Sequence, residues 1–429
     1  MGGMAAKRYY FLRASTFFLG FGIAISISGA DLVLQKVPPL TVAQAPNYPQ
    51  NLARFDLGAQ IESDVPDDAS SSVPFLSGDP ASVYGLRTGT TRLLISLAQI
   101  ENIGSIAFLN SEAKGTVTIA ISSAKLSPES PQWHDAGEEE LSSGLISARI
   151  GPAEAKYVRL TFNVGSPGRI GSLGIYSAAA VSDFTMPRAR KIAAASSADA
   201  MAMANYNLAD LHAKARTIFV SSGDDLKLAY NMIDGQPGTA YGFAANDAAP
   251  AAIFDLGHFV SVNRISTFST PSSAAVTFYL LGALPGNNTG NLESSLRIDP
   301  QTLAAFRTVG TGNDDGSGRV VVDFEEITGR YVVLVWTPST RNANFSIAEV
   351  AVFGPASNAR LLAANTIGNN RSDTSDGKTV RDSKDAKDFS KEIPGEGAAE
   401  GEALGEGPVP ELPRPPPFVF IPRVVPTSP

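Results

Sequence analysis

The chain of 429 residues contains no cysteine, which excludes disulfide bonds, thiolate catalysis and cysteine-based zinc sites. Its three histidines, His134, His212 and His258, share no metal-ligand spacing, and each is predicted to be a surface residue. Charged residues make up only 18 % of the chain, and the net charge of -8 argues against nucleic-acid binding, which needs a basic surface. Stability must therefore come from hydrophobic cores, and the chain is long enough for two or three domains.

Motifs for common catalytic chemistries are missing as well. The sequence has no Gly-x-Ser-x-Gly nucleophile elbow and no His-Glu-x-x-His helix. The stretch Asn313–Gly318 resembles a calcium loop, but its distance to the next suitable Glu is wrong for a helix-loop-helix site. We therefore expect a protein that is not an enzyme.

An apolar run near the N-terminus has the features of a secretion signal. The basic residues Lys7 and Arg8 precede the run at residues 17–25, and small residues at Ser28 and Ala30 predict cleavage after Ala30. The alternative is an uncleaved anchor helix, for which the run is short. The sequence thus predicts an exported protein (periplasmic, cell-surface or secreted) with no transmembrane span after residues 1–30 are removed.

The chain repeats itself once. Residues 75–85, FLSGDPASVYG, return as residues 233–242, IDGQPGTAYG, and each copy ends in a matched pair of apolar strands. A period of about 160 residues is too long for a solenoid unit, so it predicts two tandem domains. We place the first domain at residues 51–177 and the second at residues 206–355.

Both copies consist of short apolar or alternating runs separated by Gly-, Pro- and Ser-rich turns. This pattern predicts an all-β protein with two tandem antiparallel β-sandwich jelly rolls. The expected strands are residues 92–97, 103–109, 116–121, 145–150, 157–162 and 173–176 in the first copy, and 216–220, 252–256, 262–268, 276–281, 319–324, 330–336 and 347–353 in the second.

Three segments lie outside these domains. Residues 31–50 read as an extended lead-in, and residues 178–205 read as a linker that is either a short helix or a flexible spacer. Residues 356–429 form an acidic, then Pro-rich tail that is predicted to be disordered. Within it, the apolar segment Phe418–Val425 either docks on a partner protein or is idle.

The second copy resembles the discoidin family, also called coagulation factor 5/8 type C, which overlaps with galactose-binding-like carbohydrate-binding modules. The resemblance rests on residues 233–241 (IDGQPGTAY), on residues 254–257 (FDLG), and on the closing strands at 329–334 and 346–354. It implies an eight-stranded jelly roll. The first copy looks like a diverged member, with Ser77 and Ser172 where the second copy has Asp and Glu, respectively.

The resemblance also implies a structural calcium ion in the second domain. Carried over by position, its ligands are the carboxylates of Asp234 and Glu349, the carbonyl of Gln236 and the hydroxyl or carbonyl of Thr239. Calcium prefers such hard oxygen ligands. The alternative is that Asp234 only caps the turn with its side chain.

Where members of the family bind a sugar, the ligand lies among loops at one end of the sandwich. Here these loops are residues 270–274 and 338–345. The second loop offers a planar donor, two amides and an aromatic ring, which suit sugar hydroxyls and an apolar sugar face, and a tryptophan lies beside it. Alternatively, these polar residues only solvate a turn. The candidate ligand-binding residues are Arg341, Asn342, Asn344, Phe345 and Trp336.

Two functions follow from these observations. The first is an exported, non-catalytic binding protein that recognises glycans or other cell-surface material. The second is a structural or assembly protein of the cell envelope or extracellular matrix, which uses the jelly rolls and the tail for protein contacts. An accessory subunit of a polysaccharide-degrading complex is a third reading. A role for Trp133 in packing is favoured over one in sugar binding.

Overall fold

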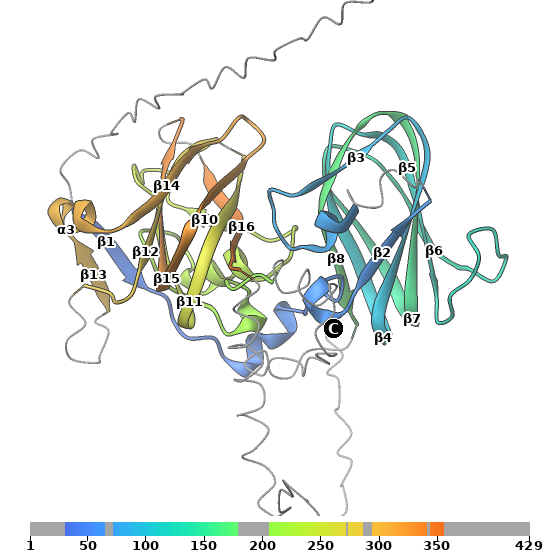
Figure 1. The fold of residues 1–429 in the computed structure, drawn as a ribbon, viewed down its shortest axis with the longest axis horizontal. Coiled ribbons are helices and arrows are strands. Elements are labelled where there is room, and N and C mark those ends of the chain that lie inside the picture. The colour runs from blue at the N-terminus through green and yellow to red at the C-terminus, as the bar shows by residue number, and fades with distance from the viewer. Residues whose placement is uncertain are drawn as a thin grey trace, which may run out of the picture. The chain divides into compact units, whose positions relative to one another are not determined.

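The computed structural model describes residues 31–64, 72–178, 206–271, 273–285, 294–340 and 344–355, all within one compact unit of the chain (Figure 1). The predicted secretion signal, most of the linker and the tail lie outside these residues. Within the described ranges, no helix combines the length and apolar character needed to cross a membrane.

The first sheet has seven antiparallel strands in the order β3-β8-β4-β7-β5-β6, with β2 paired to β4 (Figure 1). The long strands β4 and β7 pair along most of their length. The strands are β2 (Gln60–Ser63), β3 (Val83–Leu86), β4 (Gly89–Ser111), β5 (Lys114–Ser122), β6 (His134–Glu140), β7 (Gly144–Ser166) and β8 (Gly168–Ser177).

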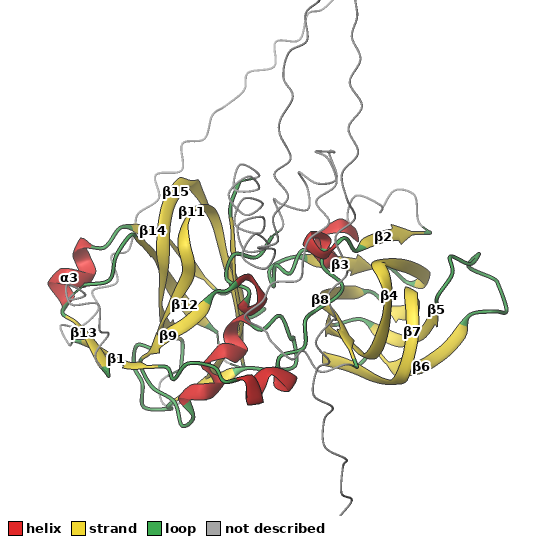
Figure 2. Cartoon of the chain, turned by 90° about the horizontal axis from the view of Figure 1, so that it is seen from below, coloured by secondary structure: helices red, strands yellow, loops and turns green. Residues whose placement is uncertain are grey.

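The second sheet has nine strands in the order β13-β1-β9-β11-β15-β12-β14, with β16 paired to β10 and β11. Helical segments are few and short, so strands dominate the described chain (Figure 2). The strands are β1 (Leu32–Lys36), β9 (Arg216–Val220), β10 (Tyr241–Phe243), β11 (Ala251–Thr270), β12 (Ala274–Leu281), β13 (Ser295–Ile298), β14 (Thr308–Asn313), β15 (Arg319–Pro338) and β16 (Phe345–Phe353). The described helices are η1 (Val42–Asn47), η2 (Phe55–Leu57), η4 (Val73–Leu76), η5 (Leu211–Ala213), η6 (Leu226–Ile233) and α3 (Pro300–Ala305).

Every pairing in the first sheet has a counterpart in the second. Strand β4 pairs with β2, β7 and β8, and β11 pairs with β9, β15 and β16. The pairs β5–β6, β5–β7 and β3–β8 correspond to β12–β14, β12–β15 and β10–β16. The prediction of an all-β protein with two antiparallel jelly-roll sandwiches is therefore confirmed, and all the predicted strands lie inside observed ones.

The long strands bend at matching places, which lets one strand serve both layers of a sandwich. In β4 the register shifts between Ser96 and Glu101, and in β11 it shifts between Asp255 and Val260. Strand β4 pairs with β2 before its shift and with β8 after it, and β11 pairs with β9 before its shift and with β16 after it. Alternating side chains then fill the space between the layers. The two interiors are separate hydrophobic clusters, one in each sandwich.

The second sandwich has an additional apolar surface on the outside of its sheet. Ile253, Tyr279 and Val333 lie there on neighbouring strands, and they pack against Leu34 of β1 and Leu303 of α3. Strand β1 and the β13–α3 segment thus cover a face that water would otherwise reach. Burying these side chains gives the added elements a hydrophobic driving force.

The equivalent face of the first sandwich is more polar, and none of the described segments adds strands to it as β1 and β13 do in the second. By strand register, Leu94, Ala120 and Arg159 take the places of Ile253, Tyr279 and Val333. Arg159 and Leu94 are half-buried rather than buried. The difference in side chains between the two copies therefore explains why only one sheet gains extra strands.

Residues 31–48, which we call the strap, belong to the second sandwich although they precede the first in sequence. Strand β1 pairs with β9 and β13, and the Tyr230 hydroxyl donates to the Pro38 carbonyl over 3.1 Å. The Gln236 side-chain amide donates to the Asn47 carbonyl over 3.0 Å. The first sandwich is thus inserted between the strap and the rest of the second. Of the predicted extended lead-in, only β1 is a strand, because Val42–Asn47 forms the 3-10 helix η1.

Candidate functional site

The motif loop of the second sandwich, residues 234–239, is organised around one buried carboxylate. Asp234 ends η6, is 1 % exposed, and precedes Gly235, whose φ of 68° requires a residue without a side chain. Its oxygens accept hydrogen bonds from the Gln236 backbone N–H (2.9 Å), the Gln236 side-chain amide (2.9 Å) and the Thr239 hydroxyl (2.9 Å). Asp234 therefore caps the turn, as one of the two sequence readings proposed.

Glu349 places a second carboxylate near this loop. It lies on β16 opposite Phe268 of β11, is 8 % exposed, and its Oε1 has no hydrogen-bond partner. Burial, with the charge of Asp234, raises the pKa of Glu349 well above its usual value. Burial also raises the pKa of Asp234 to about 8, although its hydrogen-bond donors oppose the shift. Two acids that share a low-dielectric site each make ionisation of the other harder.

The structure brings all four predicted calcium ligands to this one place. Two carboxylates, the Gln236 carbonyl and the Thr239 hydroxyl are hard oxygen donors of the kind that Ca²⁺ prefers, and an unpartnered buried oxygen on Glu349 fits a cation. A bound ion would supply the positive charge that lets both acids ionise. Among the described residues, no group of three or more His, Cys, Asp or Glu side chains is arranged to hold a metal. Neutral oxygens would thus have to complete the shell.

The same loop is held by residues of the first sandwich. The Gly235 carbonyl accepts a hydrogen bond from the Tyr176 hydroxyl over 2.9 Å and a longer one from the Arg54 guanidinium over 3.5 Å. Arg54 is 9 % exposed and also donates to the Leu173 carbonyl over 3.4 Å. The motif loop is therefore part of a junction between the two sandwiches.

The contact is reciprocal, because residues of the second sandwich hold the corresponding loop of the first. Asp79, only 6 % exposed, accepts hydrogen bonds from Arg264 (2.8 and 3.0 Å) and from the Ser266 hydroxyl (2.7 Å). The Arg319 guanidinium donates to the Pro80 carbonyl over 2.8 Å. Each copy thus uses its repeated loop to bind the other copy.

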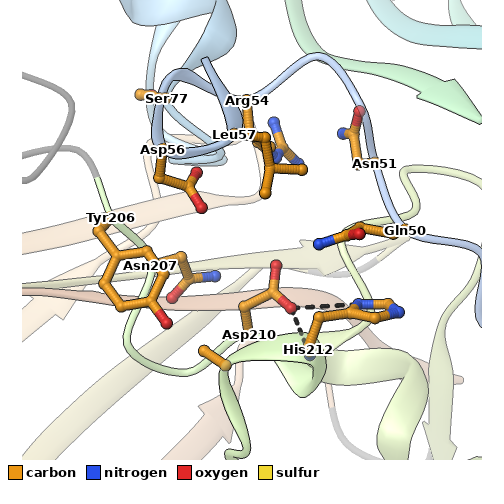
Figure 3. Close-up of a pocket in the computed structure, with 11 residues that line it drawn as sticks. Gln50, Asn51, Arg54, Asp56, Leu57, Ser77, Tyr206, Asn207, Asp210 and His212 are labelled. Atoms are coloured by element: carbon orange, nitrogen blue, oxygen red, sulfur yellow. Dashed lines mark hydrogen bonds and ion pairs between the residues drawn. The ribbon is translucent and has the colours of Figure 1, made fainter. Parts of the chain in front are cut away.

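A small polar pocket lies beside this junction (Figure 3). Asn51, Arg54, Asp210 and His212 are among the residues that line it, together with Tyr206. Its volume of about 20 Å³ is enough for a water molecule and far too small for a sugar ring. We therefore assign it to packing and hydration rather than to ligand binding.

His212 in this pocket is 8 % exposed, so the prediction that it is a surface residue is wrong. Its Nε2 lies 3.0 Å from the Tyr48 carbonyl of the strap, and its Nδ1 lies 3.3 Å from Asp210 (Figure 3). Both partners are hydrogen-bond acceptors, so each ring nitrogen can donate a hydrogen bond only when it carries a proton. Burial opposes the charge, but the hydrogen bond to Asp210 and the charge of that carboxylate outweigh it and raise the pKa of His212.

The candidate sugar-binding residues are placed less favourably. Arg341 and Asn342 lie outside the described residues, and Asn344 is exposed. Trp336 and Phe345 are 1 % and 3 % exposed, and both rings pack against Phe243 at centroid distances of 5.7 and 6.1 Å. In this structure these two rings belong to the core and present no face to a ligand.

Trp133 also has a packing role, as the sequence suggested. It is 8 % exposed, its Nε1 donates to the Ser127 carbonyl over 2.9 Å, and the Arg159 guanidinium lies 4.8 Å from its ring. Arg159 in turn donates to the Pro128 carbonyl. The tryptophan thus fixes the β5–β6 loop on the sheet.

The junction residues are the part of the site that the sequence did not reveal, although one signal was present. The sequence Asn-Leu-Ala at Asn51 recurs at Asn207. Asn51 Oδ1 accepts from the N–H groups of Ala53 and Ile175, and Asn207 Oδ1 accepts from those of Ala209 and Val352. The repeated Asn-Leu-Ala sequence thus marks an equivalent set of hydrogen bonds that connects the start of each sandwich to its last strand, next to the junction.

Known proteins resemble this chain only distantly. No protein-family model and no curated protein matches the chain. Among solved structures, a fucolectin from Morone saxatilis (striped bass) serum is 15 % identical, with 71 % of this chain and 98 % of that chain covered and a TM-score of 0.26. Chitosan-binding module 1 from a chitosanase/glucanase of Paenibacillus sp. IK-5 is 21 % identical, with 35 % and 99 % covered and a TM-score of 0.27. A module named CpGH89CBM32-6, produced by Clostridium perfringens, is 18 % identical, with 30 % and 99 % covered and a TM-score of 0.25.

The similar structures include carbohydrate-binding modules, a fucolectin, a GH29 fucosidase from Ruminococcus gnavus and an allantoicase. Their TM-scores are low, so the fold of this chain rests on its own strand pairing, in which every pair of the first sheet recurs in the second.

Proposed function

We propose that this chain is an exported, non-catalytic binding protein that recognises glycans or other cell-surface material through two tandem discoidin-like sandwiches, the first diverged. The observation that carries the proposal is the repeated pairing of the two sheets, which presents loops at sandwich ends on a rigid scaffold. The described side chains include a separate core in each sandwich and a packed junction, and the small pocket beside that junction has room for a water molecule but not for a sugar ring. Loops that are held on a rigid scaffold are suited to ligand recognition.

A glycan array with the full-length chain tests this proposal. Binding to one class of glycan, retained in chelator or dependent on calcium, is the expected result. Silence across all classes in both conditions would reject glycan recognition. Detection of the processed chain outside the cytoplasm, with an N-terminus at Asp31, tests export.

Calcium in the second sandwich belongs to the same proposal. Bound by Asp234 and Glu349, it would join the motif loop to β16 and thereby stabilise the side of the sandwich that faces the junction. Because Gln236 also binds the strap at Asn47, the ion would indirectly hold the strap. Thermal unfolding with calcium and with chelator measures this effect.

An assembly protein of the envelope or matrix is the second candidate, and one observation favours it. The chain already uses sandwich loops and sheet faces for the contact between its own two sandwiches, since Asp79 and Gly235 each accept hydrogen bonds from the other copy. The same kind of surface could bind another protein. Removing residues 408–429, which include the apolar segment Phe418–Val425, and measuring whether the chain stays in its native complex tests this alternative.

A further inference from the structure

Phe259 is the most exposed aromatic side chain of the described residues. It is 57 % exposed, whereas every other described aromatic side chain is buried or half-buried. It lies on β11 within the register shift between Asp255 and Val260, where three residues separate the buried Leu256 and Val260. The ring therefore points away from the interior, because Leu256 and Val260 face the core and adjacent side chains of a strand point to opposite faces.

The ring has a firm support on one side. A Cβ at Gly282 would lie 3.3 Å from a ring carbon of Phe259, so the side chain rests against a residue that has no side chain of its own. Gly257, two residues earlier, has a φ of 82° and approaches the Lys214 carbonyl in the same manner. The backbone around Phe259 is therefore closely packed, while the ring remains open to solvent.

An ion pair belongs to the same irregular stretch: the shift between the pairs Asp255–Tyr331 and Val260–Gly329 contains both Phe259 and Arg330, and Arg330 is paired with Asp255. The Nε and Nη2 atoms of Arg330 each lie 2.8 Å from a carboxylate oxygen of Asp255, which fixes both groups in one plane. Arg330 also stacks at 5.1 Å from the Tyr331 ring, yet 36 % of its side chain stays exposed. His258, next to Phe259, has an Nε2 that is shielded from water and has no hydrogen-bond partner.

We propose that Phe259 and the Asp255–Arg330 pair form a contact site for one pyranose ring of a glycan. The apolar face of the sugar would stack on the phenyl ring, and its hydroxyls would hydrogen-bond the carboxylate and the guanidinium. This combination of a rigid exposed ring and oriented polar groups is what sugar recognition requires. The inference rests on the proposed glycan-binding function and adds a site that the predicted loops do not contain.

The site lies at the opposite end of the sandwich from those loops. Thr270, at the end of β11, pairs with Ser346 beside those loops, whereas Val260, in the middle of β11 at its bend, pairs with Gly329. Ten residues of strand separate them, which corresponds to about 30 Å. Binding at Phe259 is therefore distinguishable from binding at residues 338–345.

The first sandwich provides a matched control. Its register shift between Ser96 and Glu101 holds Ile100 at the position of Phe259, with 52 % exposure. By register, Ser96 and Lys156 stand in place of Asp255 and Arg330. This copy has the same backbone and a similar exposed apolar side chain, but neither an aromatic ring nor the ion pair.

The experiment compares full-length wild type with Phe259→Ala, Phe259→Trp and Ile100→Ala by saturation-transfer NMR and titration. The probes are methyl β-galactoside, L-fucose, chitotriose and the strongest glycan from the array. Phe259→Ala is expected to weaken binding roughly tenfold, Phe259→Trp to preserve or strengthen it, and Ile100→Ala to leave it unchanged. Because both positions are exposed, each of the three variants should keep the wild-type melting temperature.

The outcomes separate this inference from the proposed function. If wild type binds none of the probes, glycan recognition itself is rejected, and the site with it. If wild type binds and Phe259→Ala binds equally well, the function stands and the assignment of Phe259 is overturned. Equal weakening by Ile100→Ala and Phe259→Ala would also overturn it, because the effect would then not depend on the ring.

Discussion

Replacing Asp79 by Ala should destabilise the junction far more than replacing Asp323, although both carboxylates bind the same arginine. Asp79 is 6 % exposed and accepts hydrogen bonds from Arg264 and Ser266 across the junction. Asp323 lies 2.8 Å from Arg264 as well, but its side chain is 67 % exposed. The two variants thus remove carboxylates that share Arg264 as a partner but differ in burial and in the further hydrogen bonds of Asp79 to Ser266, Ala81 and Ser82.

The magnitudes follow from that difference. Removing one partner of a buried ion pair costs about 3–5 kcal/mol, because the other charge is left without compensation. Arg264 keeps Asp323 and is partly exposed, so we place the loss for Asp79→Ala near the lower limit, at about 3 kcal/mol. An exposed ion pair contributes about 0–1 kcal/mol, which sets the expectation for Asp323→Ala.

Urea denaturation followed by tryptophan fluorescence and by far-ultraviolet circular dichroism measures both losses. Trp133 lies in the first sandwich and Trp336 in the second, so single-tryptophan backgrounds report on each half. Equal losses for the two variants, or a loss below 1 kcal/mol for Asp79→Ala, would refute the conclusion that the repeated loops hold the two sandwiches together.

Three further predictions concern the strap, the buried acids and His212. Leu34→Ala should lower the free energy of unfolding of the second sandwich by about 2–4 kcal/mol, because the side chain is fully buried, whereas Val33→Ala on the exposed face should change it little; chemical denaturation decides. Glu349→Gln should be tolerated in chelator, since burial raises the pKa of Glu349 and favours its neutral form, but it should abolish any rise in melting temperature caused by calcium; a retained rise would exclude Glu349 as a ligand. The folded state raises the pKa of His212, so the protonated ring stabilises the fold most below the usual pKa of 6.5, and this contribution is lost as the pH rises through the higher folded-state pKa. The difference in the free energy of unfolding between wild type and His212→Gln should therefore shrink as the pH rises. A constant difference would show that the folded protein does not favour the protonated His212 ring.

Much of the fold could be predicted because its determinants are local. Alternation of apolar residues identified strands such as residues 157–162, where Val158, Leu160 and Phe162 are buried and Arg159 is not. The second copy of the sequence then fixed the number of sandwiches. Neither conclusion required knowledge of which strands pair.

The candidate site was only partly accessible from sequence. The four predicted calcium ligands, Asp234, Gln236, Thr239 and Glu349, lie close together around the motif loop, and calcium binding itself stays a prediction. Trp336 and Phe345 were expected beside a ligand because they flank a loop, yet both are buried. An aromatic residue at the end of a strand can point inward or outward, and only the register of the finished sheet decides which.

The sequence by itself determined the strands, the duplication and the repeated loops, since these depend on residue periodicity and turn chemistry over a few positions. Only the tertiary structure decided that the strap joins the second sheet, that Arg54, Asp79 and Arg264 meet in a junction, and that Phe259 faces solvent. The strap and junction contacts link residues more than 150 positions apart, and the exposure of Phe259 depends on which segments pack against its strand. Their formation follows from which apolar faces and charges remain uncovered once each sandwich has closed, a condition that no local pattern contains.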